Sequence, residues 1–331
     1  MVQPHGYIDF AHPDYVCRLH KSLYGLKQAP RAWFERFMSQ LLHLGFMASV
    51  VDPSLFMYHT PHVLLYILLY VDDIIITGPN PLPINSLVNA LGRAFELRYL
   101  GPLSYFLGIQ ILLTSTGVSL NQSKYALDLL HKFDMDNAKP VKTPYCPSTR
   151  LTSTSGQLLS NPSSYRSMVG GLQYLTFTRP NLSYAIHQLC QFMQFPTDQH
   201  FATAKRVLRY VRGTLNHSLQ FNPSLLTLSA FTDADWASNP SDRWSTTSYL
   251  VFLGSSPISW SAKKQSTVSR SSIEAEYHAL TTTTIELSWL RSLCRELHLV
   301  LPHVPRLWCD NVSALALASN HLSCPYQAYQ G

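Results

Sequence analysis

The fold of this chain is constrained most by one apolar run, VLLYILLYVDDIIIT, which extends from Val63 to Thr77 and contains Asp72 and Asp73 near its centre. The run is shorter than the roughly 20 residues that a transmembrane helix needs, and each aspartate would cost about 3 kcal/mol at the centre of such a helix. Its β-branched and aromatic residues instead predict two strands joined by a turn at the aspartates. Because an unpaired buried carboxylate is costly, we expect this turn to face solvent or a cation.

Asp72 and Asp73 are the first candidate metal ligands. Successive side chains of a strand point to opposite faces, so one aspartate would bind a metal directly while the other supports it from the side. Two-metal transfer of a nucleotidyl group needs oxygen ligands that hold two Mg²⁺ ions roughly 4 Å apart. A solvated turn without a metal is the alternative, and these two residues alone leave both interpretations open.

Composition is typical of a globular protein. The 331 residues are 46% hydrophobic and 13% charged, which allows two or three domains with their own cores. The net charge of +6 is compatible with a polyanionic partner, but it is also common in proteins without one. The six cysteines form no C-x-x-C pair, and the N-terminal segment has no apolar signal core. We therefore expect an intracellular protein of the cytoplasm or nucleus that is not secreted and has no membrane partner.

Apolar periodicity outlines the rest of the chain. Residues 31–44 predict a helix. Its expected buried face consists of Trp33, Phe37, Leu41 and Leu44. Residues 139–164 are rich in proline, serine and threonine and predict a linker or an extended segment, whereas residues 165–222 predict helices. Residues 228–320 begin with strands and continue into a long helix, which indicates an α/β pattern.

The clearest helix is FATAKRVLRYVRGTL, which Gly213 is expected to end. Its apolar face, at spacings of three and four, consists of Ala204, Val207, Leu208 and Val211. Another face carries the basic stripe Lys205, Arg209 and Arg212. This stripe predicts contacts with the phosphates of a nucleic acid, and a solvated helix face is the alternative.

Three acids in the C-terminal part form a second candidate metal site. Asp233 ends an apolar stretch, Glu276 lies in the helix that starts near Ser272, and Asp310 follows the segment LWC. Metals held by such acids activate water and stabilise the leaving 3′ oxygen when a phosphodiester breaks. Asp235 shares a strand face with Asp233, and Asp310 could instead cap the helix that follows it, so both alternatives stay open from the residues alone.

Glu276, rather than Glu274, is expected to be the functional acid of the long helix. Ile273 and Leu280 place Glu276 on the apolar side, where a carboxylate needs a partner such as a metal. Ser271 and Glu274 have the spacing of a capping box, so Glu274 is expected to stabilise the start of the helix.

Several motifs together resemble the Pol polyproteins of copia-type LTR retrotransposons. Residues 70–73, YVDD, resemble the YVDD motif of reverse transcriptases. Residues 19–37, LHKSLYGLKQAPRAWFERF, resemble the copia-type block that contacts template and incoming nucleotide. The matching positions in this block are Gly25, Lys27, Gln28 and Pro30. The segments at 100–103, LGPL, and 106–109, FLGI, are similar to the approach to the primer grip, and the resemblance covers nearly the whole chain.

The C-terminal part is similar to the copia-type RNase H domain, notably in TDADWA, KKQ and EAEY. The resemblance implies that Mg²⁺ (or Mn²⁺) is held by Asp72, Asp73, Asp233, Glu276 and Asp310. It also makes Lys263 and Lys264 candidates for phosphate contacts, with an ordinary solvated loop as the alternative. The implied fold class is an α+β partial reverse-transcriptase palm and thumb followed by an α/β RNase H-like domain.

The resemblance further implies four parts and two activities. The parts are a partial reverse transcriptase at 1–135 with palm, primer grip and start of the thumb, a linker and helical thumb or connection region at 136–225, a truncated RNase H-like domain at 226–320, and an out-of-frame tail at 321–331. The activities are RNA-directed DNA polymerase and RNA–DNA hybrid ribonuclease. The implied partners are an RNA template, a DNA primer and an RNA–DNA hybrid, and the oligomeric state is left open.

Departures from the family pattern predict impaired catalysis. The family's first catalytic aspartate precedes the segment at which this sequence begins, and Asp9 lies in a stretch that matches a non-catalytic one. Arg98-Tyr99 replaces the usual Lys-Asp, and a lysine there is sometimes assigned the proton-donor role. The final acid would follow the helix after Asp310, but the sequence reads HLSCPYQAYQG, which suggests a frameshift near Asn320. A non-catalytic nucleic-acid-binding remnant and an inert pseudogene product are the alternative interpretations.

Overall fold

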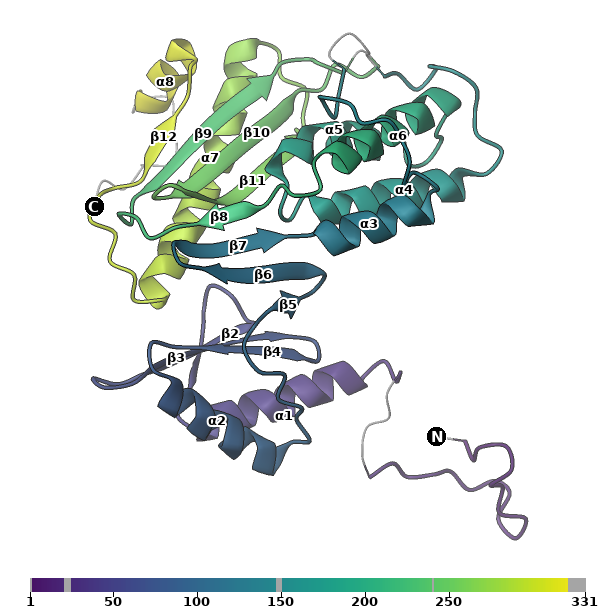
Figure 1. Cartoon of the computed structure of the whole chain (residues 1–331), viewed down its shortest axis with the longest axis vertical. Coiled ribbons are helices and arrows are strands. Elements are labelled where there is room, and N and C mark those ends of the chain that lie inside the picture. The colour runs from purple at the N-terminus through teal and green to yellow at the C-terminus, as the bar shows by residue number, and fades with distance from the viewer. Residues whose placement is uncertain (1, 21–24, 147–150, 240, 321–331) are drawn as a thin grey trace. The chain divides into compact units, whose positions relative to one another are not determined.

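The computed structural model describes residues 2–20, 25–146, 151–239 and 241–320. The chain forms two compact units, residues 1–100 and residues 101–331 (Figure 1). The finer division at residues 135, 225 and 320 stays a prediction, because compactness alone does not separate domains that pack against each other. The expected out-of-frame tail lies outside the described residues. No helix in the described part of the chain has both the length and the apolar character to cross a bilayer.

The first unit is an antiparallel sheet with two helices. Its strands lie in the order β1 (Met47–Ala48), β2 (Leu55–His59), β3 (Leu64–Tyr70) and β4 (Asp73–Thr77). Helices α1 (Ala29–His43) and α2 (Pro81–Ala94) contribute to the core that covers one face of this sheet. The predicted helix 31–44 is confirmed to within two residues at its start.

Sequence features explain why these elements form where they do. Pro30 occupies the first turn of α1, where its missing N–H costs nothing, and Gly45 follows the helix with a left-handed φ of 87°. In α2 the side chain of Asn80 accepts a hydrogen bond from the backbone N–H of Leu82 at 3.0 Å. The predicted buried face of α1 is confirmed, since Phe37 and Leu41 are fully buried and Trp33 and Leu44 pack against the same core.

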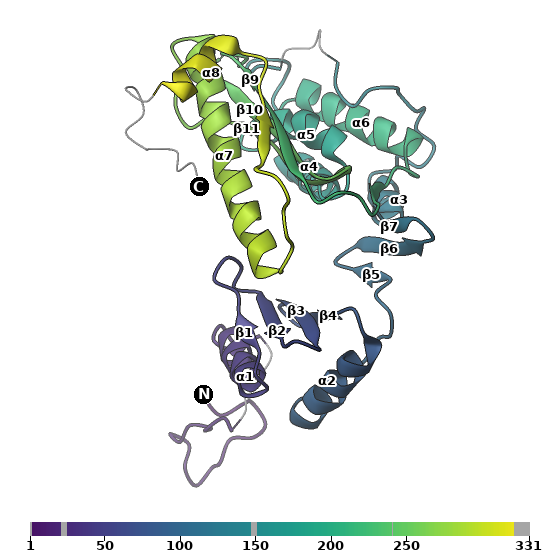
Figure 2. The ribbon, with the colours of Figure 1, turned by 90° about the vertical axis from the view of Figure 1, so that its left-hand side faces the viewer.

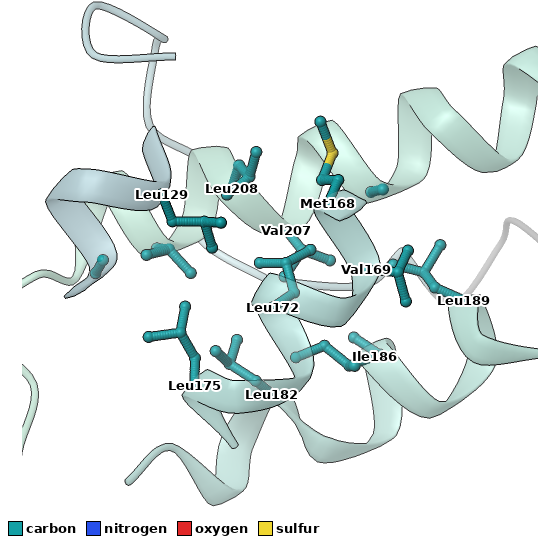
Figure 3. Close-up of a cluster of buried hydrophobic side chains, with 14 of the residues drawn as sticks. Leu129, Met168, Val169, Leu172, Leu175, Leu182, Ile186, Leu189, Val207 and Leu208 are labelled. Carbon is teal, nitrogen blue, oxygen red and sulfur yellow. The ribbon is translucent and has the colours of Figure 1, made fainter. Parts of the chain in front are cut away.

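The second unit contains a helical bundle. Its helices are α3 (Ser123–Lys132), α4 (Pro162–Leu175), the 3₁₀ turn η1 (Pro180–Leu182), α5 (Ser183–Cys190) and α6 (Asp198–Gly213). The helices predicted within residues 165–222 are confirmed, except that the end of this range forms the strand β8 (Leu219–Phe221); α3 was not predicted, and α4 begins at Pro162, inside the segment predicted to be a linker. The facing side chains of these helices form a continuous core that includes Leu172, Leu182 and Val207 (Figure 3). The predicted apolar face of α6 is confirmed, because Ala204, Val207, Leu208 and Val211 are all fully buried.

Two sheets complete the second unit. One has the order β5 (Tyr105–Phe106), β6 (Ile109–Thr114), β7 (Gly117–Asn121) and β8 (Leu219–Phe221), so a strand that follows the bundle pairs with one that precedes it. The other has the order β11 (Ser256–Lys264), β10 (Thr246–Leu253), β9 (Leu228–Asp235) and β12 (Arg306–Trp308). In that sheet β12 runs parallel to β9 and the other pairs are antiparallel.

The long helix α7 (Ser272–Glu296) connects β11 to β12, and α8 (Val312–Ser319) follows β12. Helix α7 lies along one face of the β9–β12 sheet, whereas α5 of the bundle lies on the other side (Figure 2). The bundle is tied to this sheet by hydrogen bonds from the Trp260 indole to the Thr176 carbonyl, 2.8 Å, and from the Lys264 N–H to His187 Nε2, 2.9 Å. The edge strand β11 is therefore covered by the bundle rather than left open.

Candidate carboxylate centres

The first centre lies at the β3–β4 hairpin. Tyr70 pairs directly with Asp73, so Val71 and Asp72 form a two-residue turn, and both aspartates are exposed. This confirms the prediction of two strands with the aspartates at a solvent-facing tip. Leu69 and Ile74 point to the helix-covered core, whereas the cross-strand pair of Tyr70 and Asp73 shares the opposite face.

The turn is strained at Val71. Its φ of 53° lies in the left-handed region, which a β-branched residue rarely adopts. Glycine or asparagine would satisfy a two-residue hairpin turn at lower cost. Strained residues of this kind persist where the surrounding structure holds them, and they cluster at functional sites. The valine therefore favours the functional interpretation of the adjacent aspartates over a simple solvated turn.

The second centre is built from two neighbouring strands of one sheet and the helix that packs on that sheet. Asp233 lies near the end of β9, Glu276 in the second turn of α7, and Asp310 directly after β12. The parallel pairing of β12 with β9 brings the ends of these two strands to the same edge of the sheet. Glu276 reaches the same place, because its Oε1 accepts a hydrogen bond from the Ala234 N–H at 3.1 Å. Ligand oxygens of Glu276 and Asp310 thus lie within 4.8 Å of each other, and Asp233 lies outside this group but close enough for its charge to act on Glu276.

Burial and mutual repulsion characterise this centre. Glu276 is only 6% exposed, and its burial, together with the charges of Asp233 and Asp310, raises the pKa of its carboxyl group despite the N–H of Ala234. Burial and the Asp310 carboxylate likewise raise the pKa of Asp233, with a smaller contribution from Asp235. Crowded carboxylates without a cation are therefore under electrostatic stress, which a bound cation would relieve.

Cys309 belongs to this centre and was not expected from the sequence. Single ligand atoms of Glu276, Cys309 and Asp310 all lie within 4.8 Å of one another, and the Cys309 thiol donates a weak hydrogen bond to Glu276 Oε2 at 3.9 Å. Burial raises the pKa of the thiol, as do the neighbouring carboxylates, although a hydrogen bond from the Asn311 backbone opposes them. The carboxylate oxygens are consequently the ligands available to a hard divalent ion, and they fit one. The signal that could have indicated Cys309 was its position directly before Asp310.

The structure also shows which acidic residues near the second centre stabilise helix ends. Glu274 holds the start of α7, since its N–H bonds to Ser271 Oγ at 3.1 Å and its carboxylate accepts the N–H of Arg270 at 2.7 Å. Glu274 therefore stabilises the start of α7 as predicted, although its carboxylate accepts the N–H of Arg270 and not that of the N-cap Ser271, as a capping box would require. The alternative that Asp310 caps α8 is wrong, because the side chain of Asn311 performs that role by accepting the Ala314 N–H at 2.9 Å. Asp310 remains free for another function.

Asp235 lies apart from the carboxylates around Glu276. Its Oδ2 is 3.5 Å from the Tyr184 hydroxyl of α5, and its charge contributes only the smallest of the effects on the pKa of Asp233. This favours Asp233 over Asp235 as the acid that acts with Glu276 and Asp310.

The basic stripe of α6 has a structural use. Arg209 Nε donates to the Lys139 carbonyl and Arg212 Nε donates to the Asp136 carbonyl, both at 2.7 Å. Lys205 Nζ lies over the Phe201 ring, 4.8 Å from its centroid. The two arginines thus hold the segment that follows α3. The sequence had suggested only phosphate contacts or a solvated helix face for this stripe, so this structural role was not predicted.

The remaining candidate contacts differ in their surroundings. Gly25, Lys27 and Gln28 are exposed just before α1. Lys264 forms an ion pair with Asp242, whereas Lys263 is exposed and has no carboxylate partner among the described residues.

Comparisons with known proteins agree with these motifs. Residues 1–147 match the family described as reverse transcriptase (RNA-dependent DNA polymerase). The chain is 48% identical over 321 residues, 97% of its length, to the retrovirus-related Pol polyprotein from transposon RE1 of Arabidopsis thaliana. The chain belongs to the copia-type retrotransposon Pol family. It is also 37% identical over 336 residues to the Pol polyprotein from transposon TNT 1-94 of Nicotiana tabacum.

The copia-type relatives are much longer than this chain. The aligned region is 22% of the RE1 polyprotein and 25% of the TNT 1-94 polyprotein. By contrast, an uncharacterized mitochondrial protein of Arabidopsis thaliana is 49% identical over 226 residues, and the alignment spans 94% of that protein and 68% of this chain. The chain is thus a reverse transcriptase-like portion of a copia-type Pol, a family that generally uses divalent metals and binds template and primer nucleic acids.

Proposed function

We propose that this chain carries two metal-dependent centres of a copia-type Pol. Asp72 and Asp73 would serve RNA-directed DNA synthesis, and residues 226–320 would form an RNase H-like domain that cleaves the RNA of an RNA–DNA hybrid. The observation that carries the proposal is the convergence of Asp233, Glu276 and Asp310 from a strand, a helix and a strand end. The order β11-β10-β9-β12, with α7 as the connection to the parallel strand, supports the same assignment.

The proposed cation is Mg²⁺, which Mn²⁺ could replace. All the proposed ligands are carboxylate oxygens, which hard cations of this kind prefer. When bound, such an ion activates water and stabilises the leaving oxygen of a phosphodiester. The protein's own part is positional, since the Ala234 N–H orients Glu276 and the parallel β12 holds Asp310 beside it. The proposed partners are an RNA template, a DNA primer and an RNA–DNA hybrid, in the cytoplasm or nucleus.

A non-catalytic remnant that grips nucleic acid through the α6 stripe has less support. Arg209 and Arg212 already donate to backbone carbonyls within the protein. This alternative requires several basic side chains of the stripe to contact phosphates. Of the three, only Lys205 does not donate a hydrogen bond to a backbone carbonyl among the described residues. The expectation that this chain alone is catalytically impaired stays a prediction.

Cleavage of a labelled RNA–DNA hybrid in Mg²⁺ tests the proposal. We expect slow cleavage that Glu276→Gln abolishes, because the variant removes one carboxylate ligand while keeping the shape of the side chain. Glu274→Gln is the matched control, since it changes the same residue type on the same helix outside the centre. Equal cleavage by wild type and Glu276→Gln would refute the assignment, as would a complete absence of Mg²⁺ binding by wild type in calorimetry.

Primer extension on an RNA template tests the other centre in the same way. Asp73→Asn should remove any Mg²⁺-dependent extension, whereas Asp14→Asn, an exposed aspartate in the N-terminal segment, should not. Extension that survives Asp72→Asn and Asp73→Asn together would refute the role of the hairpin.

A further inference from the structure

Cys309 places a sulfur atom beside two carboxylates of the second centre. It directly follows β12, two residues beyond Leu307, whose side chain packs against the core formed with α7. Side chains two residues apart in an extended segment point to the same face, so Cys309 also faces α7. There its Sγ atom lies 3.9 Å from Glu276 Oε2, and ligand atoms of Glu276, Cys309 and Asp310 all lie within 4.8 Å of one another. No other group of three such residues occurs in the part of the chain that the structure describes.

The spacing of these ligand atoms fits a tetrahedral zinc ion. Zinc lies about 2.3 Å from a sulfur ligand and about 2.1 Å from an oxygen ligand, so a sulfur and an oxygen bound to the same ion are roughly 3.6 Å apart. The distance of 3.9 Å between Cys309 and Glu276 would need to shorten by only about 0.3 Å. One sulfur and two carboxylate oxygens would fill three positions of the ion and leave the fourth to water.

The sulfur atom changes which cation these residues prefer. Mg²⁺ and Mn²⁺ prefer oxygen ligands, whereas Zn²⁺ binds thiolates and generally has a higher affinity than Mn²⁺ for the same set of ligands. Zinc also displaces the proton of a coordinating thiol, which is released to solvent. The backbone of Asn311 already forms a hydrogen bond with the Cys309 sulfur, and partners of this kind orient the ligands of a metal.

Glu276 is held in place for such an ion. Its side chain is 6% exposed, and its Oε1 accepts the Ala234 N–H at 3.1 Å, so Oε2 is the oxygen that faces Cys309. Asp310 is exposed and does not cap α8, because Asn311 performs that role. A ligand held in advance loses less conformational entropy when the ion binds.

We propose that Glu276, Cys309 and Asp310 form a zinc site that overlaps the proposed magnesium site. Both sets of ligands contain Glu276 and Asp310, whereas Asp233 belongs only to the magnesium set and Cys309 only to the zinc set. The two ions therefore compete, and zinc inhibits the centre. The inhibition rests on the proposed nuclease function. The zinc site itself rests only on the cysteine, the two carboxylates and their spacing.

Cobalt spectroscopy of the reduced full chain tests the site without any catalysis. Co²⁺ can replace zinc, and a bond between cobalt and a thiolate gives a charge-transfer band in the near ultraviolet. We expect this band in wild type, and we expect Zn²⁺ to remove it. Cys309→Ser should abolish the band, whereas Cys17→Ser, which changes a cysteine of the other compact unit, is the matched control and should retain it.

The carboxylate ligands are tested by the affinity for zinc. Glu276→Gln should bind Zn²⁺ at least about 10-fold more weakly than wild type, because losing a direct ligand should cost no less than losing a partner that only orients one. Excess Mg²⁺ should raise the apparent Kd of wild type for Zn²⁺, since both ions use Glu276 and Asp310. In hybrid cleavage, the zinc concentration that halves the rate should be about 10-fold higher for Cys309→Ser than for wild type.

The outcomes separate the zinc site from the nuclease. Absence of the cobalt–thiolate band in wild type, or a band that persists in Cys309→Ser, would overturn the zinc site even if wild type cleaves the hybrid. Unchanged zinc affinity in Glu276→Gln would overturn the three-residue site, and cleavage that Zn²⁺ does not inhibit would overturn its overlap with the magnesium site. A band that Cys309→Ser abolishes, with no cleavage by wild type, would keep the zinc site and remove the nuclease.

Discussion

Replacing Glu276 with glutamine should stabilise the metal-free protein. The carboxylate is 6% exposed and lies within 4.8 Å of a ligand oxygen of Asp310, with Asp233 also close enough to raise its pKa. Two like charges at about 4.8 Å repel by roughly 3 kcal/mol at an effective dielectric constant of about 20, and by about 1 kcal/mol in water. Because Asp310 is exposed, we expect a gain of about 1 to 2 kcal/mol in the free energy of unfolding.

Glutamine preserves the one hydrogen bond that holds this side chain. Its carbonyl oxygen can still accept the N–H of Ala234, and its amide can donate to a neighbouring carboxylate. A gain of this size corresponds to an increase of about 2 to 8 °C in Tm for a unit of this length. Mg²⁺ should reverse the order, since it stabilises wild type by binding to the folded state and has fewer ligands in the variant.

The assay is thermal unfolding followed by circular dichroism, in EDTA and then across a Mg²⁺ titration. Glu274→Gln is the control for loss of one negative charge, and it should be slightly destabilised because it removes a charge that stabilises the N-terminus of α7 and weakens the hydrogen bond from the Arg270 N–H. A Glu276→Gln protein that melts below wild type in EDTA would refute the claim that the carboxylates repel one another. A Mg²⁺ response equal to that of wild type would refute the role of Glu276 as a ligand.

Three further predictions concern the helical bundle. His200 Nδ1 accepts the Thr197 N–H at 3.0 Å, and burial lowers the pKa of the imidazole ring. The free energy of unfolding should therefore be highest above the unfolded pKa of 6.5 and decrease as the pH falls below it. Urea unfolding at pH 8 and pH 5 measures this decrease, which should be smaller in His200→Asn. A Cβ at Gly171 would lie 2.5 Å from a leucine side chain of α3, whereas a Cβ at Gly170 would meet open space. In thermal unfolding, Gly171→Ala should lower the free energy of unfolding by about 1 to 3 kcal/mol, and Gly170→Ala should raise it by up to about 1 kcal/mol. Equal effects of the two substitutions would contradict this packing argument. Arg179 is 5% exposed, and its guanidinium donates to the carbonyl and the hydroxyl of Thr214 at the end of α6. In the same assay, Arg179→Lys should lower the free energy of unfolding by about 2 to 3 kcal/mol. An unchanged free energy of unfolding would show that this contact is dispensable.

Local features of the structure were predictable because they depend on neighbouring residues. The hairpin at Asp72 and Asp73 follows from two apolar strands that meet at charged residues, and α6 follows from a spacing of three and four. The inward position of Glu276 and the capping role of Glu274 follow from the periodicity of a single helix. For the same reason, three of the four groups around the second centre could be named from sequence motifs.

Contacts between distant segments were decided by the tertiary structure. The sequence could not show that Arg209 and Arg212 hold the segment after α3, because the apolar face of a helix does not specify what its polar face will meet. Nor could it show that Asn311, and not Asp310, caps α8, since both residue types cap helices well. The register of β12 beside β9 brings Cys309 and Asp310 to Glu276. In that register Leu307 of β12 packs against the core formed by β9 and α7, a contact between segments far apart in the sequence that no local stretch specifies.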